Sequence, residues 1–174
     1  MNELDRRDVV AGIIGQWRQA RPDVDYSGTE VWARITRARL VVDRRMRELQ
    51  ARHGLEPWEY DVLAALRRSG PPHELSAGEL TRTMLVVPGT ITNRVDRMTA
   101  RGLIDRATSQ RDRRSTVVRL TQRGMATIDA AMPDLAALEA ELLAGLTGPE
   151  RDQLGTLLRK LMLSLGDEAR TAAA

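Results

Sequence analysis

The apolar residues of this chain change their period within one short stretch, residues 88–120. Up to residue 101 they recur every three or four positions, as on one side of a helix, and Gly102 ends that pattern. Residues 103–107 and 115–120 instead alternate apolar with polar side chains, which predicts two strands. The polar residues 109–114 between them predict a tight connection. The stretch therefore predicts a helix followed by a β-hairpin.

Helical patterns occupy the chain on both sides of this hairpin. Apolar stripes, Pro in first turns and Gly after last turns predict the limits of the helices. The expected helices span residues 4–20, 27–53, 57–68, 77–86, 88–101, 121–145 and 148–165. The residues expected to cap them are Ser27 or Thr29, Ser76 with Glu79, Thr121, and Thr147 with Glu150.

The order of these elements predicts a mainly α-helical fold with one small β-hairpin. Two short helices followed by a two-stranded basic hairpin form the arrangement of a winged helix-turn-helix. We expect N-terminal helices in residues 1–53, the winged helix-turn-helix in 54–120, C-terminal helices in 121–166 and a flexible tail in 167–174.

Arginine is concentrated around the predicted hairpin. From Arg82 to Arg114 there are eight Arg and three acidic residues, although the formal net charge of the whole chain is only +3. Such a cluster suits contacts with the phosphates of a nucleic acid. The alternative is that this chain uses Arg everywhere as its basic residue, since Lys160 is its only Lys.

The helix expected at 88–101 has an apolar face and a polar face. At about 100° per residue, the side chains that should face the core are Ile91, Val95 and Met98. The opposite face carries Thr90, Asn93 and Arg97, whose donors and acceptors suit base edges and phosphates in a DNA major groove. An ordinary solvated helix face is the alternative.

The stretch LTRTMLVVPGTITNRVDRMTARGLIDRATSQRDRRSTVVRLTQRG, residues 80–124, resembles the signature region of MarR-type transcription factors. The likeness extends over about residues 4–165. It implies a homodimer that binds a pseudo-palindromic DNA operator, with ligand-relieved repression as the usual mode. Together with the helix face and the basic hairpin tip, it predicts these DNA-contacting residues: Thr90, Thr92, Asn93, Arg94, Arg97, Arg113 and Arg114.

The same resemblance implies that the terminal helices form a dimerisation region. Leucine stripes in the C-terminal helices agree with this expectation, because they exceed what a small winged core can cover. They consist of Leu135, Leu138, Leu142, Leu146, Leu154, Leu157, Leu158, Leu161 and Leu165. Packing of these helices within one chain is the alternative.

Four residues stand in places that their chemistry makes unusual. Trp17 lies on the inner side of the first helix, Asp61 borders an apolar stripe, and Arg94 flanks the core stripe of its helix. Arg106 shares a strand face with Ile104 and should turn inward. The simplest account is a buried Asp61–arginine ion pair capped by Trp17. The alternative is a pocket for a planar anion, in which the arginines supply charge-assisted hydrogen bonds.

The motifs QW..ARPD, EYDVLAALRRSGPP, TNR and GLIDR resemble the urate-responsive branch of the MarR family. This closer resemblance implies that Trp17, Asp61, Arg94 and Arg106 bind urate or a related purine, and that binding releases the protein from DNA. Two alternatives stay open: a sensor of phenolic carboxylates, and an architectural DNA-binding protein that needs no ligand.

Several classes of protein are not expected. The absence of Cys excludes disulfides, thiolate zinc sites and cysteine redox sensing, and His53 and His73 lack metal-ligand spacing. No catalytic motif is present, so we expect neither an enzyme nor a bound cofactor or metal. No apolar run approaches the roughly 20 residues of a membrane span, and the first residues lack a signal-peptide core, which predicts a cytoplasmic protein.

Overall fold

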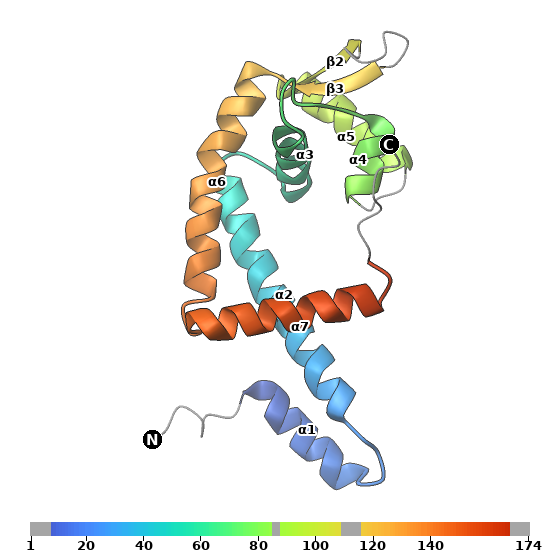
Figure 1. Ribbon diagram of the computed structural model, residues 1–174, viewed down its shortest axis with the longest axis vertical. Helices are drawn as coiled ribbons and strands as arrows, with labels where there is room; N and C mark the ends of the chain where they lie inside the picture. Colours follow the sequence, from blue (N-terminus) through green and yellow to red (C-terminus); the bar gives the residue numbers. More distant parts are fainter. Residues whose placement is uncertain (1–7, 85–87, 109–115, 168–174) are drawn as a thin grey trace. The chain divides into compact units, whose positions relative to one another are not determined.

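The computed structural model describes residues 8–84, 88–108 and 116–167 (Figure 1). The chain forms two compact units, Met1–Met132 and Pro133–Ala174, and each is described here by itself. The elements are α1 (Val9–Ala20), α2 (Ser27–Arg52), α3 (Pro57–Arg68), β1 (Glu74–Ser76), α4 (Ala77–Met84), α5 (Pro88–Ala100), β2 (Ile104–Thr108), β3 (Thr116–Leu120), α6 (Gln122–Leu142) and α7 (Gly148–Ser164).

The prediction of a mainly helical fold with a small β-hairpin is confirmed, but the sheet has a third strand. Its strand order is β1-β3-β2 and both pairings are antiparallel. In β1, Glu74 lies opposite Arg119 of β3, and their side chains form an ion pair of 2.6 Å. A strand of three residues is too short to show an alternating pattern, so the sequence did not predict it.

Two helices begin as their capping boxes predict. The backbone N–H of Ser76 donates to the Glu79 carboxylate at 2.7 Å, just before α4. The backbone N–H of Thr147 donates to the Glu150 carboxylate at the same distance, at the start of α7. Each contact satisfies a backbone donor that the first turn of a helix leaves without an internal partner. Pro133 lies inside α6, which continues to Leu142.

The predicted cap of α2 is wrong. Neither Ser27 nor Thr29 is the capping residue, because the helix already begins at Ser27 and Tyr26 occupies the N-cap position. The Asp25 carboxylate accepts from the Ser27 backbone N–H and from its hydroxyl, both at 2.9 Å. Asp25 therefore satisfies the donor, and a run of polar residues in the sequence does not tell which of them does so.

The core of the first unit lies where α3, α4, α5 and the sheet meet. Among the residues at most 1% exposed are Leu63 and Leu66 of α3, Leu80 of α4 and Ile104 of β2. The three α5 residues predicted to face the core are all buried: Ile91, Val95 and Met98. Burying each such side chain contributes about 1.5–3 kcal/mol, so the orientation of α5 about its axis is well determined.

A close backbone contact joins the hairpin to α6. The Thr121 hydroxyl donates to the Gly102 carbonyl at 2.8 Å and accepts from the Gly124 backbone N–H at 2.9 Å. Thr121 thus caps α6, as predicted. A Cβ atom on Gly124 would lie only 2.0 Å from the carbonyl oxygen of Leu103. The position therefore accepts only glycine.

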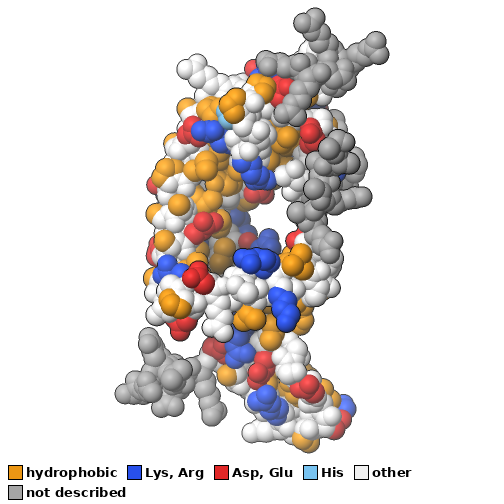
Figure 2. All heavy atoms as spheres, in the orientation of Figure 1, with side chains coloured by type: hydrophobic (Ala, Val, Ile, Leu, Met, Phe, Trp, Pro, Cys, Tyr) orange, Lys and Arg blue, Asp and Glu red, His pale blue; other side chains and the backbone are white. Residues whose placement is uncertain are grey.

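α1 packs along the N-terminal half of α2, as Figure 1 shows. Two ion pairs join these helices, Arg34 with Asp8 at 2.7 Å and Arg18 with Glu30 at 3.0 Å. Basic and acidic side chains are accordingly mixed over this region in Figure 2. Among the described helices none is both long and apolar enough to cross a bilayer.

Candidate nucleic-acid interface and ligand site

α5 presents polar side chains to solvent on the side opposite its core residues. Thr92, Asn93 and Arg97 are exposed, whereas Thr90 and Arg94 are half-buried. The predicted division of this helix into a core face and a polar face is confirmed. The exposed side carries an amide, a hydroxyl and a guanidinium within about two turns, a set that can hydrogen-bond base edges and phosphates. That these residues contact DNA stays a prediction.

Two arginines of α5 lie over the ring of Trp58 in α3. The guanidinium carbon of Arg97 is 4.9 Å from the ring centroid and that of Arg94 is 5.5 Å away. A cation over an aromatic face is stabilised by about 0.5–1 kcal/mol at an exposed site. The sequence indicated Trp58 only as part of an apolar stripe, because its partners stand on another helix. Trp58 therefore links the middle of α5 to α3.

The C-terminal end of α5 is tied to α3 through a buried carboxylate. Glu59 is 1% exposed and forms an ion pair with Arg101. Arg101 also donates to the Gly54 carbonyl at 2.6 Å, and Glu59 accepts from the Glu56 backbone N–H at 2.9 Å. Removing one partner of a buried pair leaves an uncompensated charge, which costs about 3–5 kcal/mol. Trp58 and Glu59 thus hold α5 at two points.

The prediction that Arg106 turns inward is wrong. Its side chain is about half exposed and pairs with the equally exposed Asp96 of α5. Ile104, two residues earlier on the same strand face, is fully buried. The long aliphatic part of an arginine can follow the sheet while its charged end stays in water, and Asp96 offers a partner there. Two further predicted DNA contacts, Arg113 and Arg114, lie outside the described residues.

The four residues of the predicted ligand set do not meet in this chain. Trp17 is half-exposed and stacks on Tyr26, with ring centroids 6.2 Å apart. Arg94 is the member nearest in effect to Asp61. Desolvation raises the pKa of the Asp61 carboxyl, and nearby guanidinium groups, Arg94 foremost, offset only part of that shift. Within the described residues Asp61 forms no ion pair, so the buried pair capped by Trp17 is absent there.

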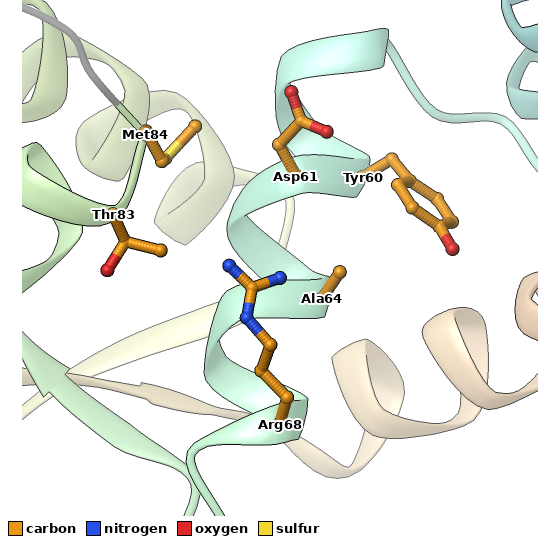
Figure 3. A pocket seen from close by; sticks show the side chains of 6 residues that line it. All are labelled: Tyr60, Asp61, Ala64, Arg68, Thr83 and Met84. Carbon is orange, nitrogen blue, oxygen red and sulfur yellow. The ribbon is translucent and has the colours of Figure 1, made fainter. Parts of the chain in front are cut away.

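Asp61 lies on the wall of two cavities. Figure 3 shows the first, of about 260 Å³, where the Arg68 guanidinium points back along α3 towards Asp61 and residues of α4 form the facing wall. Its lining residues are Tyr60, Asp61, Ala64, Arg68, Thr83 and Met84. The second cavity, of about 380 Å³, lies between α2 and α3. The described residues contain no cluster of side chains able to hold a metal ion.

Comparison with known proteins supports the fold and the class. A model of the MarR family matches residues 53–115. The HTH-type transcriptional regulator PecS of Dickeya dadantii is 31% identical over 152 residues, which are 87% of this chain and 92% of PecS. The apo form of E. coli MarR is 26% identical, covers 74% of this chain and 93% of that one, and has a TM-score of 0.61. A mutant E. coli MarR complexed with operator DNA, 23% identical, covers 84% and 97% with a TM-score of 0.67.

Proposed function

The chain belongs to the MarR family of DNA-binding transcriptional regulators, and on that premise we propose that it represses by binding a pseudo-palindromic operator as a homodimer. A planar anion, urate or a related purine, then releases it. The observation that carries the proposal is the exposed polar face of α5, which Trp58 and Glu59 hold in a fixed orientation. The operator complex of an E. coli relative with the same fold supports this assignment.

In this proposal α5 enters the major groove and the hairpin tip reaches the minor groove. The Asn93 amide can donate to and accept from an adenine edge, which makes it the main base-reading side chain. Arg94 and Arg97 contact phosphates with the edges of their guanidinium groups while their flat faces stay on Trp58. The remaining contacts come from Thr90, Thr92, Arg113 and Arg114.

The second copy covers the apolar side chains that one chain leaves in water. No residue of α7 is buried, and Leu157 and Leu165 are 58% and 59% exposed. Large apolar side chains of α1 and α2 are exposed as well, among them Val9 at 56% and Leu40 at 64%. Contiguous apolar faces of this kind mark association surfaces in water. The terminal helices therefore supply the dimer interface.

Ligand binding acts on α5 by exchanging its partners. The anion takes Arg106 away from Asp96 and Arg94 away from Trp58, while Asp61 and Trp17 bind its other edges. Asp96 and Arg94 both belong to α5, so each exchange removes a contact that holds this helix. A ligand shifts the equilibrium only by its differential affinity for the two states. The two lost contacts provide that difference.

We expect Asn93→Ala to weaken operator binding about 10- to 100-fold, because an amide–adenine pair contributes about 1–3 kcal/mol. Fluorescence anisotropy with operator and scrambled duplexes at one salt concentration measures the change. Binding to the scrambled duplex should hardly differ, since Asn93 carries sequence reading rather than charge. Thr99→Ala, exposed near the end of the same helix, is the matched control. Equal affinities of Asn93→Ala and the unaltered protein would contradict the assignment of α5.

Urate and xanthine should release the protein from its operator, whereas salicylate should act only at much higher concentration. Arg106→Ala should bind the operator nearly as well and lose this response, because its exposed pair with Asp96 contributes little to stability. Operator titrations and Trp17 emission are the measurements. Response to salicylate alone supports the phenolic-carboxylate alternative. No response to any purine at millimolar concentration, with unchanged emission, refutes the purine reading.

A further inference from the structure

The second cavity beside Asp61, called here the α2–α3 cavity, combines an apolar floor with polar walls. Its residues are Arg39, Val42, Asp43, Met46, Arg47, Gln50, Pro57 and Asp61. Those from α2 recur every three or four positions and so form one stripe along that helix. Its volume of about 380 Å³ lies at the lower end of the roughly 300–1,000 Å³ of small-molecule sites. It is large enough for a bicyclic heterocycle.

Gln50 brings an unsatisfied hydrogen-bond acceptor to this cavity. Its side chain is only 5% exposed, and within the part of the chain that the structure describes its Oε1 has no hydrogen-bond partner. A buried carbonyl without a partner destabilises the fold. The preceding residue, Leu49, is buried and apolar, so the site tolerates an apolar side chain nearby. An incoming N–H group would satisfy Gln50.

The charged groups of the cavity differ in their availability. Arg39 is engaged by Asp43, with its Nε 2.7 and 2.8 Å from the two carboxylate oxygens. Across the described ranges, 8–84, 88–108 and 116–167, Arg47 pairs with no carboxylate. The cavity thus offers one available cation and one available acceptor on the same helix stripe. A ligand with a negative or carbonyl edge and a neighbouring N–H would match both.

We propose that the α2–α3 cavity binds a planar heterocycle with an N–H group and an anionic or carbonyl edge, Gln50 Oε1 accepting from the N–H and Arg47 donating to the edge. The inference rests on the proposed purine response and deepens it, because it adds two specificity residues outside the four predicted ones. Salicylate fits less well, since its hydroxyl hydrogen is already bonded to its own carboxylate.

The position of the cavity connects it to α5. Asp61 forms part of its wall and stands one turn after Trp58 on α3. Trp58 in turn carries Arg94 and Arg97. A ligand that presses on Asp61 therefore acts on the helix that positions the DNA-contacting arginines.

The test measures binding of urate, xanthine and salicylate to the full-length protein by titration calorimetry, with operator affinity determined in parallel. Gln50→Leu and Arg47→Gln should each lower urate affinity at least tenfold. Operator affinity without ligand and salicylate binding should be unchanged. Gln50→Leu should also raise the melting temperature, because it removes the unsatisfied carbonyl. Arg44→Gln, exposed on α2 and outside the cavity, is the matched control for charge.

Each outcome decides between the two levels of the proposal. Urate release of the operator with equal urate affinity in Gln50→Leu and Arg47→Gln overturns the cavity assignment and leaves the proposed function intact. Absence of urate and xanthine binding by the unaltered protein overturns both. Should Gln50→Leu lose its circular dichroism signal, Gln50→Met, which keeps the length of the side chain, takes its place in the same titration.

Discussion

Gly124→Ala is expected to lower the free energy of unfolding by about 3 kcal/mol or more. The added Cβ would lie 2.0 Å from the Leu103 carbonyl oxygen, far inside van der Waals contact. The obstacle is backbone and cannot rotate aside as a flexible side chain would. Relief requires α6 to move from the hairpin, which breaks the hydrogen bonds through Thr121. Urea unfolding followed by circular dichroism at fixed protein concentration measures the loss.

The control for this experiment is Gly28→Ala in the first turn of α2. A Cβ at that position meets no atom within 4 Å, and alanine favours helix over glycine by about 1 kcal/mol. Stability should therefore stay equal or rise. If Gly124→Ala unfolds within about 1 kcal/mol of the unaltered protein, the close contact between α6 and the hairpin does not exist as described.

The double variant Leu157→Glu with Leu158→Glu is expected to produce monomers and to weaken operator binding about 100-fold or more. Both leucines are exposed in the single chain, at 58% and 41%, so the fold of the monomer tolerates the change. At an interface, however, the carboxylates would lose water without gaining partners, which is unfavourable. A monomer engages one half-site and loses the gain from binding two at once.

Sedimentation equilibrium gives the mass, and operator titration at fixed salt gives the affinity. Arg159→Glu, also exposed on α7 but outside the leucine stripe, should remain dimeric and serves as the control for added negative charge. A dimer that survives both glutamates would move the interface away from this face of α7. Retention of full operator affinity by a monomer would refute the symmetric mode of binding.

The main elements were predictable because each has a local cause in the sequence. Capping boxes place the starts of α4 and α7, and the spacing of Ile91, Val95 and Met98 fixes the core face of α5. β1 was not predictable, since its three residues form a strand only by pairing with β3, which lies some 40 residues later in the chain.

The candidate site was less predictable, because its side chains choose partners from distant segments. Arg106 follows the alternation of its strand, yet its length lets it reach Asp96 at the surface. Trp58 and Gln50 carry no local signal of their roles. One depends on arginines of another helix, and the other on a missing hydrogen-bond partner, which only packing reveals.

Two consecutive residues of α3, Trp58 and Glu59, set the angle of α5, and neither belongs to its exposed polar face. The side chains that would distinguish one operator from another, above all Thr92 and Asn93, have no part in that attachment. Target preference and scaffold geometry are thus encoded by separate residues. New operator sequences can be acquired by exchanging Thr92 and Asn93, while the inherited docking angle persists unchanged.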